Sequence, residues 1–171
     1  DADLDFNTFQ LGDFGWGGVT VDVPDGLQSF ITSVETANLD GSPLIVDVTV
    51  EFVAADGRVI WTFRSRDPQT GLLPEDAFAG FLPPNDSTGR GNGFVTYKVF
   101  PRTDRPNGTA IDQQASIVFD TNNPIVTNIY SNQLDTAPPT SAVLALPAAT
   151  SNTTFVVSWA GSDVNGSGVA S

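Results

Sequence analysis

Apolar and polar residues alternate along several short stretches of this chain, which is the pattern of β-strands that bury one face. The longest stretch runs from Leu44 to Phe52, where every second residue is apolar and Asp47, Thr49 and Glu51 occupy the opposite face. This stretch predicts a strand with one face in a hydrophobic core and the other in water.

A second alternating stretch follows the turn dipeptide Asp56-Gly57 and places Val59, Trp61 and Phe63 on one face. Two alternating stretches joined by an Asp-Gly turn are a strong signal of a β-hairpin. The two stretches are therefore predicted to pair with each other and to direct their apolar faces into the same core.

The rest of the chain carries the same signals, because Asp-Gly and Asn-Gly turn dipeptides separate short apolar stretches. A composition rich in Asn, Thr, Ser, Gly and Asp also favours strands and turns over helices. The predicted fold class is all-β, with an immunoglobulin-like antiparallel β-sandwich followed by an incomplete second β-sandwich. Further strands are expected at residues 19–23, 94–100, 110–119, 125–130, 141–146 and 153–159, with a long loop over 67–93.

Three segments are expected along the chain. Residues 1–133 form the first β-sandwich, residues 134–140 a stiff linker with two adjacent prolines, and residues 141–171 a partial immunoglobulin-like or fibronectin III-like segment. The last segment has too few strands for a complete sandwich, so we expect it to need a partner sheet. Its candidate assembly residues are Val143, Leu144, Leu146, Phe155, Val157 and Trp159.

The charge of the chain excludes nucleic acid as a partner, and its apolar pattern argues against membrane insertion. It has 20 acidic and 7 basic residues, a net charge of −13, and Lys98 is its only lysine. A nucleic-acid-binding protein needs a basic surface, which this chain cannot build. No apolar run approaches the length of a membrane span, so no membrane insertion is expected.

The absence of cysteine and histidine from the sequence argues against catalysis. Neither a Ser-His-Asp triad nor a thiol nucleophile can be built, and the few glutamates do not suggest a glycosidase pair. We therefore expect no enzyme activity and no required cofactor. A chain without cysteine or methionine has little to oxidise, which favours an extracellular or cell-surface location.

Calcium is the metal that the acidic turns of this sequence favour, because it prefers oxygen ligands. Asp1, Asp3 and Asp5 stand at alternate positions, and Asp163 and Asn165 lie in a glycine-rich stretch. These residues are candidate ligands, while a solvated chain start and an ordinary turn stay open as the alternatives. Trp16, among four nearby glycines, is a candidate aromatic for stacking on a sugar.

Several sequence motifs are found in residues 61–71, 80–85, 91–97, 115–120, 123–127, 135–141, 158–163 and 166–169. These motifs resemble a conserved repeat of very large secreted bacterial proteins of the adhesin-like, cell-surface type. That resemblance implies a β-sandwich repeat, followed by the start of a fibronectin III-like or immunoglobulin-like domain, and carries over no catalytic residue. In that family the first domain has additional strands before the position of Asp1.

The resemblance leads us to expect a chain that begins within one sandwich and ends within the next. Strands lent to a neighbouring copy would then build a filament, so copies of itself or neighbouring domains are the expected partners. The first hypothesis is a structural or adhesive module of a secreted bacterial surface protein. A carbohydrate-binding accessory module of a secreted enzyme and a calcium-stabilised spacer domain are the alternatives.

Overall fold

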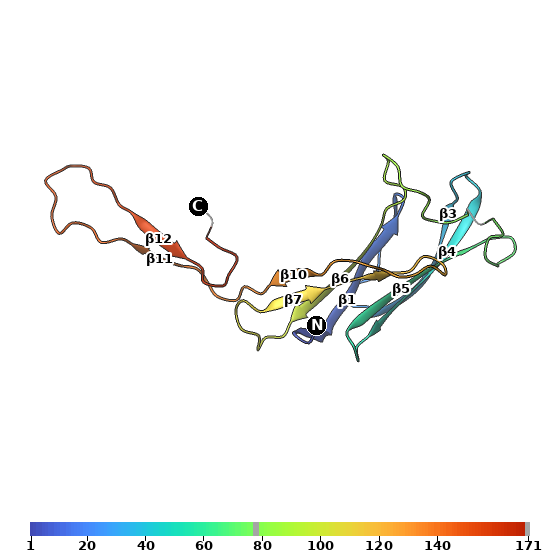
Figure 1. Ribbon diagram of the computed structural model, residues 1–171, viewed down its shortest axis with the longest axis horizontal. Helices are drawn as coiled ribbons and strands as arrows, with labels where there is room; N and C mark the ends of the chain where they lie inside the picture. The colour runs from blue at the N-terminus through green and yellow to red at the C-terminus, as the bar shows by residue number, and fades with distance from the viewer. Residues whose placement is uncertain (77–78, 170–171) are drawn as a thin grey trace. The chain divides into compact units, whose positions relative to one another are not determined.

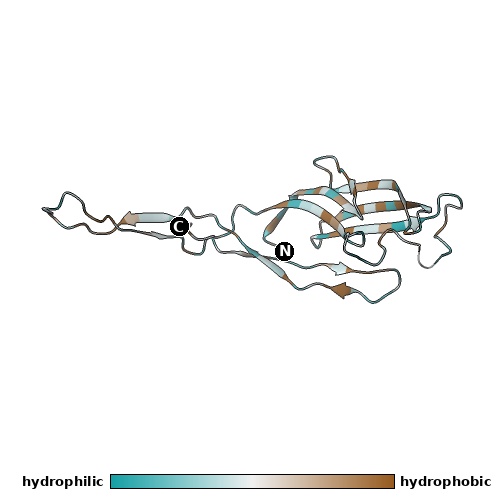
Figure 2. Ribbon diagram, turned by 90° about the horizontal axis from the view of Figure 1, so that it is seen from above, coloured by the Kyte–Doolittle hydropathy of each residue, from teal (hydrophilic) through white to brown (hydrophobic). Residues whose placement is uncertain are grey.

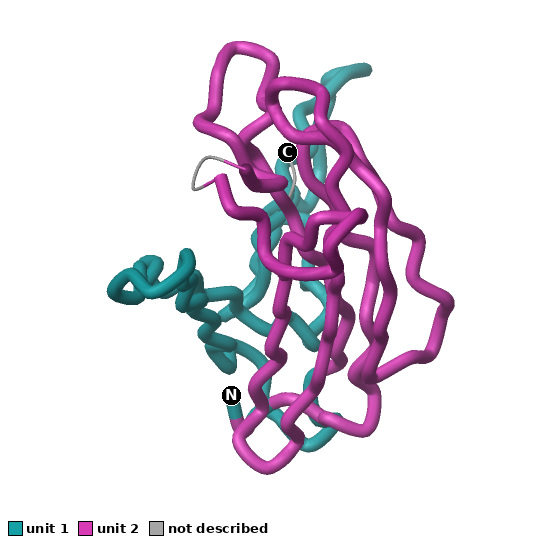
Figure 3. The backbone as a smooth tube through the Cα atoms, turned by 90° about the vertical axis from the view of Figure 1, so that its right-hand side faces the viewer, with its two compact units in different colours: residues 1, 3, 101–171 teal, residues 2, 4–100 magenta. Residues whose placement is uncertain are grey.

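The computed structural model describes residues 1–76 and 79–169 of the chain. It divides into two compact units, shown in Figure 3. Unit 2 consists of residue 2 and residues 4–100, and unit 1 consists of residues 1, 3 and 101–171. Every regular element of the described residues is a β-strand, as the sequence predicts (Figure 1).

Unit 2 is an antiparallel β-sandwich of two three-stranded sheets. In one sheet, β1 (Leu4–Trp16) lies between β2 (Val19–Val21) and β6 (Gly93–Pro101). In the other, β4 (Pro43–Val53) lies between β3 (Ser29–Ala37) and β5 (Arg58–Arg66). Brown and teal bands alternate along these strands in Figure 2, as expected for sheets with one buried face.

The predicted hairpin is confirmed. β4 and β5 pair antiparallel, with Val48 opposite Phe63 and Val50 opposite Trp61. The apolar residues of β4 form its buried face, as the alternation predicted. The members of this face are Leu44, Val46, Val48 and Val50.

Aromatic rings join the two sheets of unit 2. The fully buried Phe14 of β1 makes edge-to-face contacts with Trp61 and Phe63 of β5, at centroid distances of 5.3 and 5.9 Å. Near the other end of the sandwich, Phe9 of β1 stacks on Phe52 of β4 at 4.1 Å. Such pairs contribute stability beyond the apolar area that they bury.

The alternation did not reveal two of the strands. In β1 the buried residues are Phe9 and Leu11, and then Phe14 and Trp16, so the buried set changes from odd to even positions. One extra residue in a strand, as at a β-bulge, produces this change and hides the two-residue period. β3 mixes serine, threonine and glutamate with only a few large apolar residues, which leaves a weak signal.

Unit 1 consists of short paired strands. β7 (Ala110–Gln113) pairs with β10 (Tyr130–Gln133), and β8 (Ser116–Ile117) pairs with β9 (Ile125–Val126). The strands predicted at 110–119 and 125–130 are therefore each interrupted, since side chains of Gln114 and Thr127 take over backbone hydrogen bonds there.

The last strand pair of unit 1 is formed by β11 (Thr140–Val143) and β12 (Trp159–Ser162). The second strand was predicted at 153–159 and is found later, with only Trp159 in common. β11 is also shorter than the predicted strand at 141–146. The described part of this segment thus forms one two-stranded hairpin, and its assignment to a second sandwich stays a prediction.

The division between the units falls between residues 100 and 101, earlier than the predicted domain end at 133. β6 pairs with β1 inside unit 2, whereas β7 pairs with β10 inside unit 1. A turn-rich segment over residues 102–109, which contains Pro106, separates β6 from β7. Among the described residues there is no helix long and apolar enough to cross a membrane.

Replacing Phe14 by alanine is expected to destabilise unit 2 by about 3–5 kcal/mol, because a buried ring leaves a cavity between the sheets. Urea unfolding followed by near-UV circular dichroism measures this loss. Ile31→Ala, at an exposed position of β3, is the control and should change stability by no more than about 0.5 kcal/mol. Equal effects of the two substitutions would contradict the assignment of Phe14 to the core.

Candidate functional sites

The hairpin of β11 and β12 exposes apolar side chains to solvent. Val143 lies opposite Trp159 in the strand pairing, and the Leu144 N–H donates to the carbonyl of Ser158, which continues the ladder by one residue. All of the candidate assembly residues are about half exposed. These residues are Val143, Leu144, Leu146, Phe155, Val157 and Trp159.

No charged residue occurs between Thr140 and Ser162, although the whole chain carries a net charge of −13. Proteins usually protect exposed strand edges from association with charged side chains, especially lysine, or with bulges. The hairpin has no such charge in the strands or in the connection between them. It is therefore an apolar, unprotected edge that is suited to pairing with another β-structure.

A set of hydrogen bonds around Asn107 holds the linker at the base of this hairpin. The Asn107 Oδ1 accepts from the backbone N–H groups of Thr136 and Ala137, at 2.7 and 3.3 Å. Its Nδ2 donates to the carbonyls of Val164 and Asn165, at 2.9 and 3.1 Å. One amide side chain thus fixes both the linker and the loop that follows β12.

Two carboxylates add to this junction. Asp135 accepts from the Ser167 N–H at 2.9 Å, and Asp163 accepts from the Gly168 N–H at 2.8 Å. The hydrogen bonds from Ser167 hold the pKa of Asp135 below its usual value. Because this folded-state pKa is lowered, the contact favours the folded junction at neutral pH and is lost as the pH falls through that pKa.

The predicted ligands Asp163 and Asn165 belong to this junction. Asn165 has a φ of +58°, which is the left-handed turn conformation that asparagine tolerates. The Asp163 Oδ1 is buried and has no hydrogen-bond partner within the described structure. A Cβ placed on Gly166 would overlap the Asp163 carboxyl, so a larger residue there would require this side chain to move.

The other predicted ligands are not brought together. Asp1 accepts from the N–H groups of Asp3 and Asp112, and Asp3 forms an ion pair with Arg105 at 3.2 Å. Asp5 accepts from the backbone and side chain of Asn7. Within residues 1–76 and 79–169, no three Asp, Glu, His or Cys side chains are placed to hold a metal ion.

The prediction that Trp16 is a stacking surface for sugars is wrong. Its side chain is only 3% exposed, and its ring packs against Phe63 and Phe81 at centroid distances of 5.9 and 5.3 Å. The nearby glycines suggested an exposed turn, but the turn begins only after Trp16, which is the last residue of β1. A buried ring cannot stack on a ligand.

The comparisons with known proteins name no activity. Residues 78–133 match the model of a family described as a domain of unknown function (DUF7619). The matched segment extends from the loop before β6 to the end of β10 and so includes residues of both units. No curated protein and no solved structure matches the chain.

The sequence did not reveal the role of Asn107. The dipeptide Asn107-Gly108 indicates a turn, and Gly108 has the expected positive φ of +83°. The groups that Asn107 binds lie far along the chain, in the linker and after β12. No local pattern encodes such distant partners, so only the three-dimensional structure identifies this residue.

Substitutions of Asn107 are expected to separate its two contacts. Asn107→Ala should speed amide hydrogen exchange at Thr136 about fivefold or more, because it removes the acceptor of that N–H. Asn107→Asp should leave Thr136 protected and loosen the loop at Ser167, because it keeps the acceptor and removes the donor. Asn132→Ala, at an exposed position of β10, is the control. Unchanged exchange at Thr136 in Asn107→Ala would contradict the proposed clamp.

Proposed function

We propose that this chain is a structural or adhesive module of a secreted bacterial surface protein, which assembles with its neighbours by strand complementation. The observation that carries the proposal is the uncharged, apolar hairpin of residues 140–162. The resemblance of several motifs to repeats of adhesin-like cell-surface proteins supports the same function. Neither observation involves catalysis, and no enzyme activity is proposed.

A second copy of the chain is the partner that we propose for the hairpin. A two-stranded hairpin is marginally stable in water, and its apolar side chains gain free energy when a further strand or sheet covers them. The sandwich of every other copy offers edge strands with unpaired backbone groups, because its sheets are open. Addition of the hairpin to such an edge gives a head-to-tail contact, which propagates into a filament.

The proposed location follows from the same chemistry. A chain without cysteine or methionine tolerates an oxidising environment, and an acidic surface suits a module that binds neither nucleic acid nor anionic membrane. We therefore propose an extracellular or cell-surface location for the module.

Insertion of a charge into the hairpin should disrupt assembly. Val157→Lys places a cation at a 51% exposed apolar position, and it should raise the apparent dissociation constant about tenfold or more, because burying an unpaired charge is unfavourable. Light scattering and negative-stain electron microscopy over a concentration series measure assembly. Val164→Lys is the matched control, because it makes the same change at a 71% exposed valine outside the hairpin.

Three results would count against this proposal. A chain that stays monomeric at every concentration would refute self-assembly. An assembly that both lysine variants reduce equally would refute the role of the hairpin. A closed dimer would refute the filament while leaving the self-association intact.

A calcium-stabilised spacer is a second candidate function, favoured by the buried Asp163 Oδ1 that has no hydrogen-bond partner. Calcium at Asp163 and Asn165 would stabilise the junction, so it should raise the melting temperature of unit 1 relative to a sample in EDTA. Asp163→Asn should abolish that difference, and Asp5→Asn, in unit 2, should leave it unchanged. Equal melting with calcium and with EDTA would rule out this candidate.

A further inference from the structure

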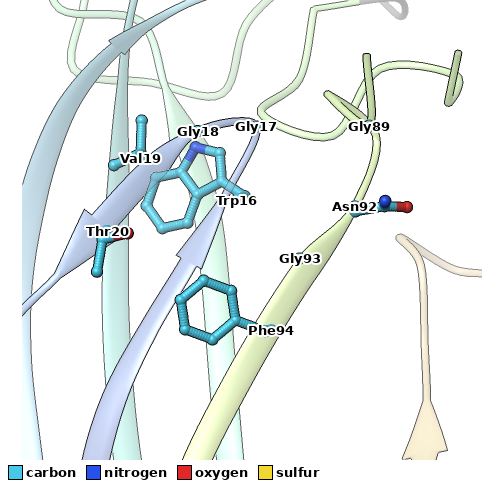
Figure 4. Close-up of a pocket in the computed structure, with 9 residues that line it drawn as sticks. All are labelled: Trp16, Gly17, Gly18, Val19, Thr20, Gly89, Asn92, Gly93 and Phe94. Carbon is cyan, nitrogen blue, oxygen red and sulfur yellow. The ribbon is translucent and has the colours of Figure 1, made fainter. Parts of the chain in front are cut away.

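A small pocket lies in unit 2 where β1 turns into β2, and its volume is about 230 Å³ (Figure 4). Its walls come from the β1–β2 turn, from the loop before β6 and from the start of β6. Four of its nine lining residues are glycines, so much of its surface is backbone. The lining residues are Trp16, Gly17, Gly18, Val19, Thr20, Gly89, Asn92, Gly93 and Phe94.

The indole N–H of Trp16 lacks a partner at this pocket. The side chain is 3% exposed, and its Nε1 is buried without a hydrogen bond in the described structure. In Figure 4 the nitrogen lies on the side of the ring nearest the Gly17–Gly18 turn, which lines the pocket. A buried donor without an acceptor is unfavourable, and an indole can only donate, so a ligand that supplies an oxygen would satisfy it.

The β1–β2 turn keeps the pocket open. Gly17 and Gly18 have φ values of +51° and +88°, which other residues adopt only with strain. A Cβ on Gly17 would also lie 3.1 Å from the carbonyl oxygen of Arg90. The backbone conformation therefore favours glycine at both positions, and the close carbonyl of Arg90 adds a steric reason at Gly17 alone.

Phe94 supplies an aromatic surface at the pocket. Its ring lies against the backbone of β1, because a Cβ on Gly15 would be 2.9 Å from Phe94 Cε1. The side chain is nevertheless 46% exposed. The ring is thus supported on the protein side and accessible to a ligand, which is the role that the sequence suggested for Trp16.

The polar groups of the pocket are neutral. Thr20 contributes a hydroxyl, and Asn92 an amide whose Oδ1 accepts from the Asn85 Nδ2 at 2.8 Å. None of the nine lining residues carries a charge. A ligand with a full charge would find no counter-charge here, whereas a neutral ligand with hydroxyl groups would find both hydrogen-bonding groups and an apolar surface.

From this geometry we infer that the pocket binds a neutral sugar residue. The apolar face of the sugar stacks on Phe94, and a hydroxyl or ring oxygen accepts the hydrogen bond from Trp16 Nε1. Pockets for drug-sized ligands span about 300–1,000 Å³, so this smaller pocket suits one sugar residue or the end of a glycan chain. This gives the module a ligand that is chemically distinct from a second copy of itself.

Titration with neutral sugars followed by ¹H–¹⁵N NMR tests the inference. The probes are glucose, galactose, mannose, N-acetylglucosamine and their short oligomers, each up to tens of millimolar. At least one should shift the Trp16 indole N–H signal, which is assigned by its loss in Trp16→Phe. Trp16→Phe and Phe94→Ala should each weaken binding about fivefold or more, because they remove the donor and the stacking surface.

Two matched control variants distinguish the loss of a pocket contact from a general effect of removing an aromatic side chain or an indole N–H. Phe100→Ala removes a 49% exposed phenylalanine from the same strand outside the pocket, and binding should be unchanged. Trp61 also has a buried indole N–H without a hydrogen-bond partner, but it does not line the pocket. Trp61→Phe should therefore bind the sugar as the unmodified chain does. Urea unfolding of each variant verifies that unit 2 remains folded.

The inference is overturned if none of the neutral probes binds, or if Phe94→Ala and Phe100→Ala bind equally well. Stronger binding of an anionic sugar such as galacturonate would overturn the assignment of a neutral ligand. Val157→Lys, which tests assembly, should bind the sugar as the unmodified chain does. Loss of assembly and loss of sugar binding are therefore distinguishable outcomes.

Discussion

The packing of β4 against β1 determines most of what unit 2 can do. The four buried aliphatic residues of β4 and the aromatic residues of β1 remove the inner faces of both sheets from water. This burial fixes the register of β4 with its neighbours, since a slip of one residue would turn the apolar face outward. It also fixes the end of β1, and so places Trp16 and the glycine turn that lines the pocket.

The two units use apolar residues in opposite ways. In unit 2 they are paired across a sandwich, and the rings around Phe14 contact one another. In unit 1 the hairpins leave similar residues exposed, among them Phe155 and Trp159. Burial therefore explains the stability of unit 2, whereas the exposed apolar residues of unit 1 indicate where an interaction partner would contribute.

The sequence predicted elements whose pattern is local and uninterrupted. The β4–β5 hairpin was found with its core residues because the alternation is unbroken within Leu44–Phe52 and within Val59–Phe63, and a turn dipeptide joins the two stretches. β1 was missed because its buried set changes phase between Leu11 and Phe14. Phe94 was assigned to a strand correctly, but its place beside the Gly17–Gly18 turn depends on the pairing of β6 with β1, which no local pattern encodes.

The pairing of β1 with β6 has a consequence for the order of folding. β3, β4 and β5 are neighbours in sequence and form a meander that closes over short loops. β1 pairs locally with β2, but its other partner, β6, begins about eighty residues later, as the hydrogen bond between Thr96 and Asp13 illustrates. Since long loops close more slowly than short ones, the meander is the natural nucleus. The sheet that covers its apolar face is then complete only when β6, the last strand of unit 2, pairs with β1.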